Sequence, residues 1–352
     1  MNKKNIKIFH GPVNIAGKGG YLSEYQRRNG YISDFVVWNE NKFFGNHDLC
    51  LHINKYPKFI SIWILFFWFI ISLLKYNIFH FYYGVSLIPF NLDLPLLKLF
   101  RKKVVMTYCG SDIRLMEIDR LRNPYWNILN DSNNVDNLKN DKKKKIKIRW
   151  HAIWIDKFTA SRELYDYVKF IIPGKKIIND LWLNFPQIKY NGYQKNKIPV
   201  IVHAPSDEIF KGTKYIEKAL KELEYEGYEF EYVKLENKNQ DIVEKNIKKS
   251  DIVIDQLLIG SFGNLSLEGL ANGKIVITFL SDIIKESYFP DIPIINANID
   301  NIKDVIKDLL DNCDKWDELK NKGPKWIEKY FNIITINERV IKELYEIDDI
   351  TH

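Results

Sequence analysis

The sequence predicts an α/β protein of two doubly wound domains with a cleft between them. The chain has 352 residues, which is long for one core and suits two domains of ordinary size. Short apolar runs rich in β-branched residues alternate with helical patterns along it. A polar, aperiodic stretch at 187–197 indicates a linker. We therefore expect an N-terminal domain over 1–187, a C-terminal domain over 198–331, and a last helix within 332–352.

The first half shows strand patterns separated by helical segments. The predicted strands are Ile6–His10, Asp34–Trp38, Ile78–Tyr82, Val104–Tyr108, Phe158–Ser161 and Phe170–Ile172. The segment Phe59–Leu74 is apolar for 16 residues apart from two serines, whereas a spanning helix needs about 20. We expect a helix wedged between the sheet and its neighbours, with interfacial insertion as the alternative because Phe and Trp abound, and a true span as the weakest option.

The second half repeats the alternation. The predicted strands are Val200–His203, Tyr228–Leu235 and Asp251–Asp255, and the predicted helices are Lys214–Tyr225, Asp241–Lys248, Ile302–Leu310, Trp316–Phe331 and Asn337–Tyr345. The helix at 214–225 places Ile216, Ala219, Leu220 and Leu223 at i, i+3, i+4 and i+7. This spacing forms one stripe that faces a core.

The net charge restricts the kinds of binding partner, and the cysteine content restricts the cellular compartment. The net charge of +7 favours anionic partners such as nucleotides or acidic lipid surfaces and does not indicate nucleic acid. Three separated cysteines fit neither a disulfide framework nor a zinc spacing, and the N-terminus has no signal-peptide core. We expect a cytoplasmic protein. The basic cluster Lys142–Arg149 predicts a solvated loop or, alternatively, a surface facing a membrane or a phosphate-rich acceptor.

The run from Asp251 to Ile277 is the most informative part of the chain. It predicts a buried strand, a glycine turn, a helix beginning near Asn264, and a second buried strand. Such a turn aims free N–H groups and a partial positive charge at one point, which is how helices hold phosphate. Glu268 lies one turn into the helix, where its carboxylate can accept hydrogen bonds from sugar hydroxyls. The pattern predicts a nucleotide whose diphosphate meets the helix start and whose ribose meets Glu268.

A second glycine turn follows the first predicted strand. Gly17, Gly19 and Gly20 precede a helix and would let the backbone approach a ligand, or they are required only sterically. Their spacing is not that of a nicotinamide-binding turn.

The loop after the strand Val200–His203 carries a candidate phosphate ligand. Lys211 directly precedes a helix, where an ammonium group can neutralise a diphosphate leaving group without a metal ion. The alternative for Lys211 is an ordinary surface lysine. His203 either packs at the end of its strand or contacts the nucleotide.

The strand Val104–Tyr108 delivers Ser111, Asp112 and Arg114 to the rim of the first domain. Asp112 either orients or deprotonates an acceptor hydroxyl, or caps the following helix. Arg114 either pairs with Asp112 or binds an anion. No Asp-x-Asp, His/Cys cluster, hydrolase elbow or Walker loop occurs, so we predict no catalytic metal.

Four segments, in order, make the chain resemble family-4 glycosyltransferases of the GT-B fold, which has two Rossmann-like domains. They are Gly17–Gly20, Cys109–Arg114, His203–Thr213 and Ile259–Lys274. The resemblance implies metal-independent transfer with retention of configuration, without a cofactor, from a UDP- or GDP-linked sugar held by the second domain. The acceptor, a glycan or a lipid-linked sugar, would be held by the first domain, onto which the last helix would cross back.

The resemblance also implies residue roles. Glu268 would bind the donor ribose, Lys211 the diphosphate, and the amides of Asn264, Leu265 and Ser266 the phosphates. The donor site would be completed by Gly263, His203, Gly17, Gly19 and Gly20. Ser111 and Arg114 would lie on the acceptor side, near Asp112.

The chain departs from the family pattern at three places. Gly260 stands where the first glutamate of the family's Glu-x7-Glu pair normally touches the donor sugar. Ser206–Glu208 fill the positions before the lysine where the family often has an arginine, so Arg114 or Lys18 would have to substitute. Cys109 replaces a common histidine.

Three functions follow as hypotheses. The first is a retaining glycosyltransferase in cell-surface polysaccharide or glycolipid synthesis, at the cytoplasmic side and in peripheral contact with the membrane. The second is a catalytically silent GT-B protein that binds a partner or a sugar nucleotide. The third is a sugar-nucleotide epimerase on the same fold, which Gly260 disfavours because it removes a candidate acid or base.

Overall fold

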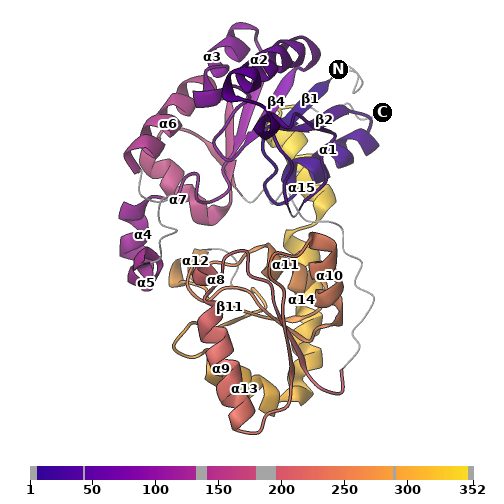
Figure 1. Cartoon of the computed structure of the whole chain (residues 1–352), viewed down its shortest axis with the longest axis vertical. Coiled ribbons are helices and arrows are strands. Elements are labelled where there is room, and N and C mark those ends of the chain that lie inside the picture. The colour runs from indigo at the N-terminus through magenta and orange to yellow at the C-terminus, as the bar shows by residue number, and fades with distance from the viewer. Residues whose placement is uncertain (1–5, 43, 132–140, 180–195, 288–290, 348–352) are drawn as a thin grey trace. The chain divides into compact units, whose positions relative to one another are not determined.

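The computed structural model describes residues 6–42, 44–131, 141–179, 196–287 and 291–347. By its internal contacts the chain forms two compact units. The first unit comprises residues 1–118, 136–186 and 333–352, and the second comprises 119–135 and 187–332. Of the predicted linker, residues 187–195 lie outside the described part of the chain. Figure 1 labels the elements of both units.

The first unit contains a seven-stranded parallel sheet in the order β3-β2-β1-β4-β5-β6-β7. Its strands are β1 (Lys7–Gly11), β2 (Ile32–Val37), β3 (Leu49–Cys50), β4 (Ile78–Tyr82), β5 (Lys103–Thr107), β6 (Lys157–Ala160) and β7 (Ile177–Asn179). Its helices are α1 (Lys18–Arg28), α2 (Lys58–Lys75), α3 (Leu94–Leu99), α6 (Asp141–Trp154), α7 (Arg162–Ile171), α15 (Ile333–Arg339) and the π-helical η6 (Val340–Leu344). The strand order reverses between β1 and β4, so loops that leave these strands diverge at their carboxyl ends.

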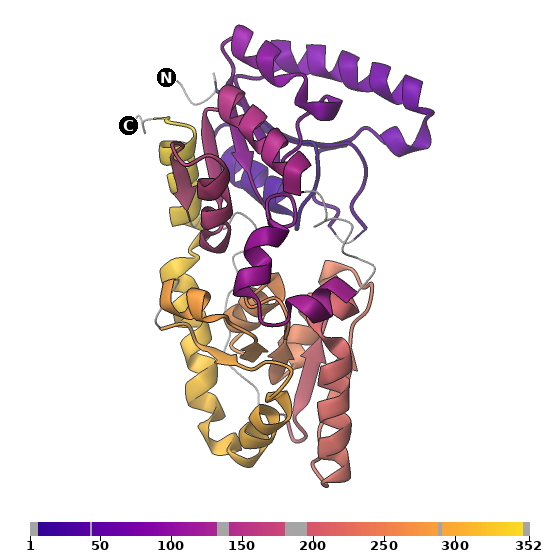
Figure 2. The ribbon, with the colours of Figure 1, turned by 90° about the vertical axis from the view of Figure 1, so that its left-hand side faces the viewer.

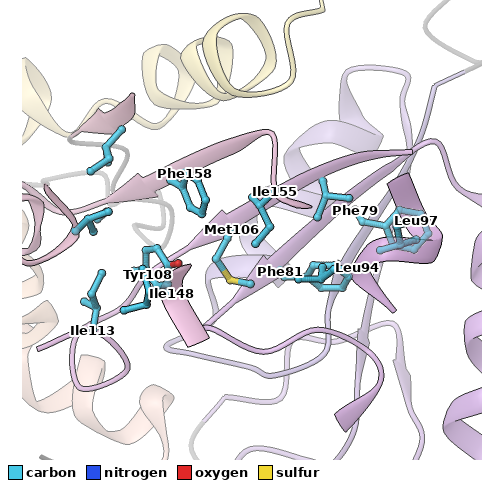
Figure 3. Packing of buried hydrophobic residues seen from close by; sticks show 14 of the residues in the cluster. Phe79, Phe81, Leu94, Leu97, Met106, Tyr108, Ile113, Ile148, Ile155 and Phe158 are labelled. Atoms are coloured by element: carbon cyan, nitrogen blue, oxygen red, sulfur yellow. The ribbon is translucent and has the colours of Figure 1, made fainter. Parts of the chain in front are cut away.

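Large apolar side chains fill the space between this sheet and its helices. Figure 3 shows Phe79 and Phe81 from β4 and Met106 from β5 among Leu97 of α3 and Ile148 of α6. All five are fully buried. The parallel strands are apolar on both faces because helices cover both sides of the sheet.

Two local predictions in this unit are wrong. The basic cluster Lys142–Arg149 is not a loop, because it forms part of α6, whose Ile148 and His151 are buried. The predicted strand Phe170–Ile172 ends α7 instead, and the strand follows as β7. In α7 the buried side chains are Leu164, Tyr167, Val168 and Ile171. Their helical spacing continues to Ile171, so packing favours helix over the β-propensity of the last residues.

The apolar segment Phe59–Leu74 forms α2, as predicted, but it is not covered by its surroundings. Only Leu65, Phe69, Ser72 and Leu73 are buried. Within the described residues α2 is the one helix long and apolar enough to cross a membrane, with a mean hydropathy of 1.9 and 22% of that window buried.

The second unit contains a five-stranded parallel sheet in the order β12-β11-β10-β8-β9. Its strands are β8 (Val200–His203), β9 (Glu231–Lys234), β10 (Ile252–Ile254), β11 (Ile275–Thr278) and β12 (Ile294–Asn296). Its helices are α5 (Trp126–Asp131), α8 (Glu208–Lys211), α9 (Thr213–Tyr225), α10 (Gln240–Lys249), α11 (Asn264–Ala271), α12 (Asp282–Ser287), α13 (Ile302–Asp311) and α14 (Trp316–Tyr330). α4 (Met116–Arg122) begins in the first unit and ends in the second. The strand order reverses between β8 and β10.

Residues 119–131 belong to the second unit, although the sequence suggested the first. Tyr125 and Leu129 are buried in one cluster with Leu258 and Phe279. The Asn123 side-chain amide donates a hydrogen bond of 2.9 Å to the carbonyl of Leu258. These partners lie more than a hundred positions along the chain, so no local pattern reveals them.

Two glycines allow α11 to pack tightly. A Cβ at Gly269 would lie 2.8 Å from the Val276 side chain of β11, and one at Gly323 would lie 2.6 Å from the Leu270 carbonyl oxygen. α11 is therefore held between β11 and α14 at closer range than any side chain would permit.

The last helical segment belongs to the first unit. The Tyr345 hydroxyl lies 2.7 Å from Nδ1 of His80 in β4 and 3.4 Å from the Gln26 amide in α1. Glu346 forms ion pairs with Lys103 and Lys157. Side chains from three strands and one helix thus fix this end of the chain on the first sheet.

Candidate functional site

In the second unit, Lys211 forms an ion pair with Asp255 at the point where the strand order reverses. Nζ of Lys211 lies 2.5 Å from Oδ1 of Asp255 and 2.7 Å from Oε1 of Gln256. Asp255 directly follows β10, and Lys211 ends the short helix that follows β8. The carboxyl ends of parallel strands at such a reversal are the usual place for ligands in doubly wound folds.

Local structure explains why Lys211 reaches this position. The Asp207 carboxylate caps α8 by accepting hydrogen bonds from the amides of Ile209 and Phe210. Gly212 then adopts a left-handed conformation with φ of 75° and starts α9. Only 14% of the Lys211 side chain is exposed, so the interpretation as an ordinary surface lysine is wrong.

Asp255 also organises the start of α11. Its Oδ2 accepts hydrogen bonds from the Gly263 amide at 2.8 Å and from the Ser266 hydroxyl at 2.7 Å. Burial alone would raise the pKa of Asp255, but the Lys211 charge and these hydrogen bonds outweigh burial and lower it. A Cβ at Gly263 would lie 2.8 Å from Oδ2, so glycine is needed there. The helix begins at Asn264, as predicted, and the Leu265 side chain is buried.

Glu268 lies one turn into α11, as predicted. It is 9% exposed, and its Oε1 accepts a hydrogen bond of 2.7 Å from the Gln240 side chain of α10. Burial raises the pKa of Glu268 to about 7. A carboxylate with one neutral partner and little water gains from hydroxyl donors, so Glu268 suits a ligand that presents them.

His203 packs inside the second unit. Its Nδ1 lies 2.8 Å from the Ile254 carbonyl, and its Nε2 lies 2.9 Å from the Thr213 hydroxyl. Because the carbonyl only accepts, Nδ1 carries the proton and Nε2 accepts from Thr213. Burial lowers the pKa of His203 to about 4, so the ring is neutral. Both nitrogens are engaged, which favours the packed strand-end interpretation over a nucleotide contact.

Gly260 has a backbone conformation that suits glycine. Its φ is +78°, and a Cβ there would lie 3.1 Å from the Ser281 Cβ and 3.2 Å from the Phe279 ring. A glutamate in this conformation would be strained and crowded.

In the first unit, packing accounts for the predicted glycines. Gly17 has φ of 74° and caps α1, and its amide donates to the Asn14 side chain at 2.9 Å. A Cβ at Gly19 would lie 2.6 Å from the Phe35 ring, and one at Gly20 would lie 2.2 Å from the Asn46 carbonyl oxygen. Steric crowding thus explains why Gly19 and Gly20 are glycines. A contact of Gly17, Gly19 or Gly20 with the donor stays a prediction.

Asp112 closes the turn after β5. Its Oδ1 accepts hydrogen bonds from the amides of Cys109 at 3.0 Å and Gly110 at 2.7 Å. Asp112 does not cap α4, because Asp141 accepts from the first two amides of that helix. Burial raises the pKa of Asp112, while the amides and the Lys147 ammonium oppose the shift. Its role toward an acceptor stays a prediction.

The neighbours of Asp112 include residues that the sequence did not indicate. The Lys147 ammonium of α6 faces Gly84 and the Asp112 carboxylate. Ser111 hydrogen-bonds the Tyr83 hydroxyl at 2.5 Å. Arg114 pairs with Glu163, whose side chain is 15% exposed, at 3.1 Å. Each of these pairs joins residues that are far apart in the sequence, so no local sequence pattern predicts it. Lys147 belongs to the basic cluster, which was noted only for its charge.

One group of potential metal ligands occurs among the described residues. Glu40, His47 and Cys50 bring ligand atoms within 4.8 Å of one another beside β3. Their spacing is not a metal-binding motif, which is why the sequence predicted none. Metal-independent chemistry stays a prediction.

Comparisons with known proteins identify the fold. No protein-family model and no curated protein matches the chain. The solved structures include sucrose-phosphate synthase from Thermosynechococcus elongatus, at 11% identity over 96% of this chain and 98% of that one, with a TM-score of 0.66. Anabaena HepE (Alr3699) in complex with UDP-glucose matches at 11% identity over 97% and 99%, with a TM-score of 0.66.

A sugar-nucleotide enzyme of another type is also similar. A putative UDP-N-acetylglucosamine 2-epimerase from Listeria monocytogenes matches at 14% identity over 97% of each chain, with a TM-score of 0.58. These matches cover nearly the whole chain and confirm the predicted GT-B fold of two doubly wound α/β units. Identities this low establish the fold alone.

Proposed function

We propose that this protein is a retaining, metal-independent glycosyltransferase of family 4. It transfers a sugar from a UDP- or GDP-linked donor to a glycan or lipid-linked acceptor in cell-surface polysaccharide or glycolipid synthesis. The observation that carries the proposal is the arrangement around Asp255. It holds one cation, Lys211, and the start of one helix, α11, at the same edge of the second sheet.

A diphosphate needs such an arrangement. The amides of Asn264, Leu265 and Ser266 at the start of α11 offer donors and the positive end of the helix dipole, whereas the Gly263 amide already donates to Asp255. Lys211 adds an ammonium group, which its ion pair with Asp255 holds in place beside these amides. In the transfer step the bond between the anomeric carbon and the β-phosphate oxygen breaks, and the nucleoside diphosphate leaves with an additional negative charge. Lys211 and the amides would stabilise that charge.

Glu268 supplies the second half of donor recognition. Two ribose hydroxyls would donate to its carboxylate, which accepts one hydrogen bond from the Gln240 side-chain amide. Asn264, which begins the helix, and Glu268 both lie on α11, four residues apart. The UDP-glucose found with the similar HepE structure supports a nucleotide sugar as donor.

A screen of donor binding tests the proposal. Isothermal titration calorimetry with UDP-glucose, UDP-N-acetylglucosamine and GDP-mannose should find one donor that binds. Glu268→Ala should weaken that binding at least about tenfold, since two hydrogen bonds to a charged group are lost. The matched control is Glu224→Ala at an exposed side chain of α9, which should leave affinity unchanged. Equal affinity of Glu268→Ala and the parent would contradict the role of Glu268.

Chemistry is tested separately. With a bound donor and a mixture of glycan and lipid-linked acceptors, NMR of the product should show the donor's anomeric configuration, and a chelator should not reduce the rate. An inverted product, or a rate restored only by a divalent ion, would contradict the mechanism while leaving donor binding intact.

A catalytically silent GT-B protein is the second candidate. Gly260 favours it, because the chain lacks the glutamate that would touch the donor sugar, and a glutamate at this position would be strained and crowded. This candidate predicts donor binding without transfer to any acceptor. An epimerase, suggested by the similar Listeria structure, would instead convert the donor sugar in the absence of an acceptor.

A further inference from the structure

The helix α2 and the segment around α3 expose many large apolar side chains. Together these form what we term the apolar face. Its members on α2 are Phe59, Ile62, Trp63, Phe66, Phe67, Ile70, Ile71 and Leu74, and its members around α3 are Phe90, Leu92, Leu96, Leu99 and Phe100. Their exposed fractions run from 39% at Ile70 to 89% at Phe90. A contiguous patch of a few hundred Å² is already the largest on a typical monomer, and larger ones mark interaction sites.

Both parts of the apolar face lie at the same end of the first unit. α2 and α3 appear next to each other there in both views (Figures 1 and 2). The opposite sides of the two helices contribute Phe69, Leu73, Leu94 and Leu97 to one buried cluster. This shared core fixes the two helices in place, so the exposed side chains form a surface of the folded unit.

The position of α2 in the fold excludes a transmembrane span. Its N-terminal end continues from β3, and its C-terminal end leads through Tyr76 into β4, a central strand of the same sheet. Leu65, Phe69 and Leu73 hold one side of the helix against the first unit. Because both ends return to one unit, α2 lies along a surface and does not cross a bilayer.

The charge around the apolar face is positive. Residues 49–111 contain seven Lys or Arg residues and one acidic residue, Asp93, which is buried. Among the described residues, Lys55, Lys58 and Arg101 have no acidic partner. They stand at the start of α2 and directly after α3. Exposed apolar rings flanked by such cations are the pattern of proteins that lie in the interface of an anionic bilayer.

We propose that the apolar face inserts into the interfacial layer of an anionic phospholipid bilayer, with Lys55, Lys58 and Arg101 at the lipid headgroups. The indole of Trp63 contacts the rings of Phe66 and Phe67, at centroid distances of 6.0 and 6.2 Å. Trp prefers the boundary between headgroups and acyl chains. A second copy is a poorer occupant, because a symmetric contact would bring identical unpaired cations together.

Vesicle flotation of the full chain tests this interaction. The protein should float with phosphatidylcholine vesicles that contain phosphatidylglycerol, and more weakly with phosphatidylcholine alone or at high salt. The double variant Phe67→Glu/Ile71→Glu should lose at least about tenfold in vesicle affinity. The two apolar side chains would no longer be buried in the bilayer, and two negative charges would face anionic headgroups. Tyr225→Glu, which alters an exposed side chain of the second unit, is the matched control and should float like the parent.

Two further variants separate the contributions. Lys55→Gln/Lys58→Gln/Arg101→Gln should lose about fivefold in affinity per removed charge, and only toward the anionic vesicles. Trp63→Phe should bind normally but lose the fluorescence quenching by brominated acyl chains that the parent shows. Unchanged quenching in Trp63→Phe would place another tryptophan at the lipid and overturn the assigned face.

The remaining outcomes overturn the proposal. They are a parent protein that does not float with anionic vesicles, and a Phe67→Glu/Ile71→Glu variant that is folded by circular dichroism and floats like the parent. Parent dimers in analytical ultracentrifugation that this variant dissolves, without vesicle binding, would show that a second copy covers the face. None of these results bears on donor binding by the second unit, so the two proposals fail independently.

Discussion

Lys211 and Asp255 meet at 2.5 Å, with the carboxylate fully buried and the ammonium largely so. The pair joins the helix α8, which follows β8, to the end of β10, and the same carboxylate accepts a hydrogen bond from the amide of Gly263, directly before α11. A buried charge without its partner is costly, whereas removing both charges together is often nearly neutral.

Removal of Lys211 alone should therefore affect both activity and folding. We expect Lys211→Ala to lower the free energy of unfolding by about 3 kcal/mol, because the Asp255 charge is left buried. Turnover should fall about a hundredfold or more, because the departing diphosphate loses a cation. Chemical denaturation and initial rates measure the two effects.

The double variant Lys211→Ala/Asp255→Asn distinguishes them. It should regain most of the lost stability but none of the lost turnover. If turnover returned with stability, Lys211 would be a structural residue only. Lys214→Ala, which removes a cation from the adjoining helix, serves as the control and should alter neither quantity.

Glu268 predicts a particular dependence of stability on pH. Its pKa is raised to about 7 in the folded protein by burial, above its ordinary value. Between these two values the folded state binds a proton that the unfolded state has released, so the contribution of Glu268 to stability falls as pH rises. The free energy of unfolding of Glu268→Gln should hence rise relative to that of the parent, by roughly 1–3 kcal/mol in total, as the pH goes from about 5 to about 8. Denaturation curves across this range measure it, and a constant difference would contradict the raised pKa.

Donor binding should release protons near neutral pH. Ribose hydroxyls that donate to Glu268 stabilise its ionised form and lower its pKa in the complex. Binding enthalpies measured in two buffers of different ionisation enthalpy should reveal this release, and Glu268→Gln should abolish it. Equal enthalpies in both buffers for the parent would show that Glu268 does not change its protonation on binding.

Introducing a glutamate at position 260 should destabilise the second unit. Gly260→Glu should lower the free energy of unfolding by about 1–3 kcal/mol, because φ is +78° and Ser281 and Phe279 occupy the space. Gly45→Ala, at a glycine with no atom near its Cβ position, should change stability little. A Gly260→Glu protein that is as stable as the parent and transfers faster would show that the loop rearranges.

The hydroxyl group of Tyr345 should stabilise the first unit through its hydrogen bond with His80. Tyr345→Phe removes the partner of His80 Nδ1 and leaves that buried nitrogen unsatisfied. We expect a loss of about 1–3 kcal/mol in the free energy of unfolding. Tyr225→Phe, at an exposed hydroxyl, should lose less than about 0.5 kcal/mol in the same denaturation experiment.

Local sequence patterns predicted the elements whose limits are determined by residues close in the chain. The limits of β4, β8 and α11 follow from apolar runs bounded by polar or glycine residues, and Lys211 and Glu268 stand where the pattern placed them. Asp255 was predicted only as the end of a strand, since its partners come from two other loops. Asp141, Glu163 and Lys147 were missed for the same reason.

Long-range packing explains the other differences. The lysines of α6 suggested a loop, but one apolar stripe against the first sheet suffices to make a helix. The apolar composition of α2 suggested burial on all sides, yet composition alone does not specify which side is covered.

The first unit is assembled from sequence segments that the second unit interrupts, and its closing helix reaches His80 through Tyr345. During synthesis, β1 to β7 emerge from the ribosome well before the hydroxyl that ties them to that helix. Until residues 187–332 have been translated, the first unit therefore lacks the contacts that Tyr345 and Glu346 make with three of its strands.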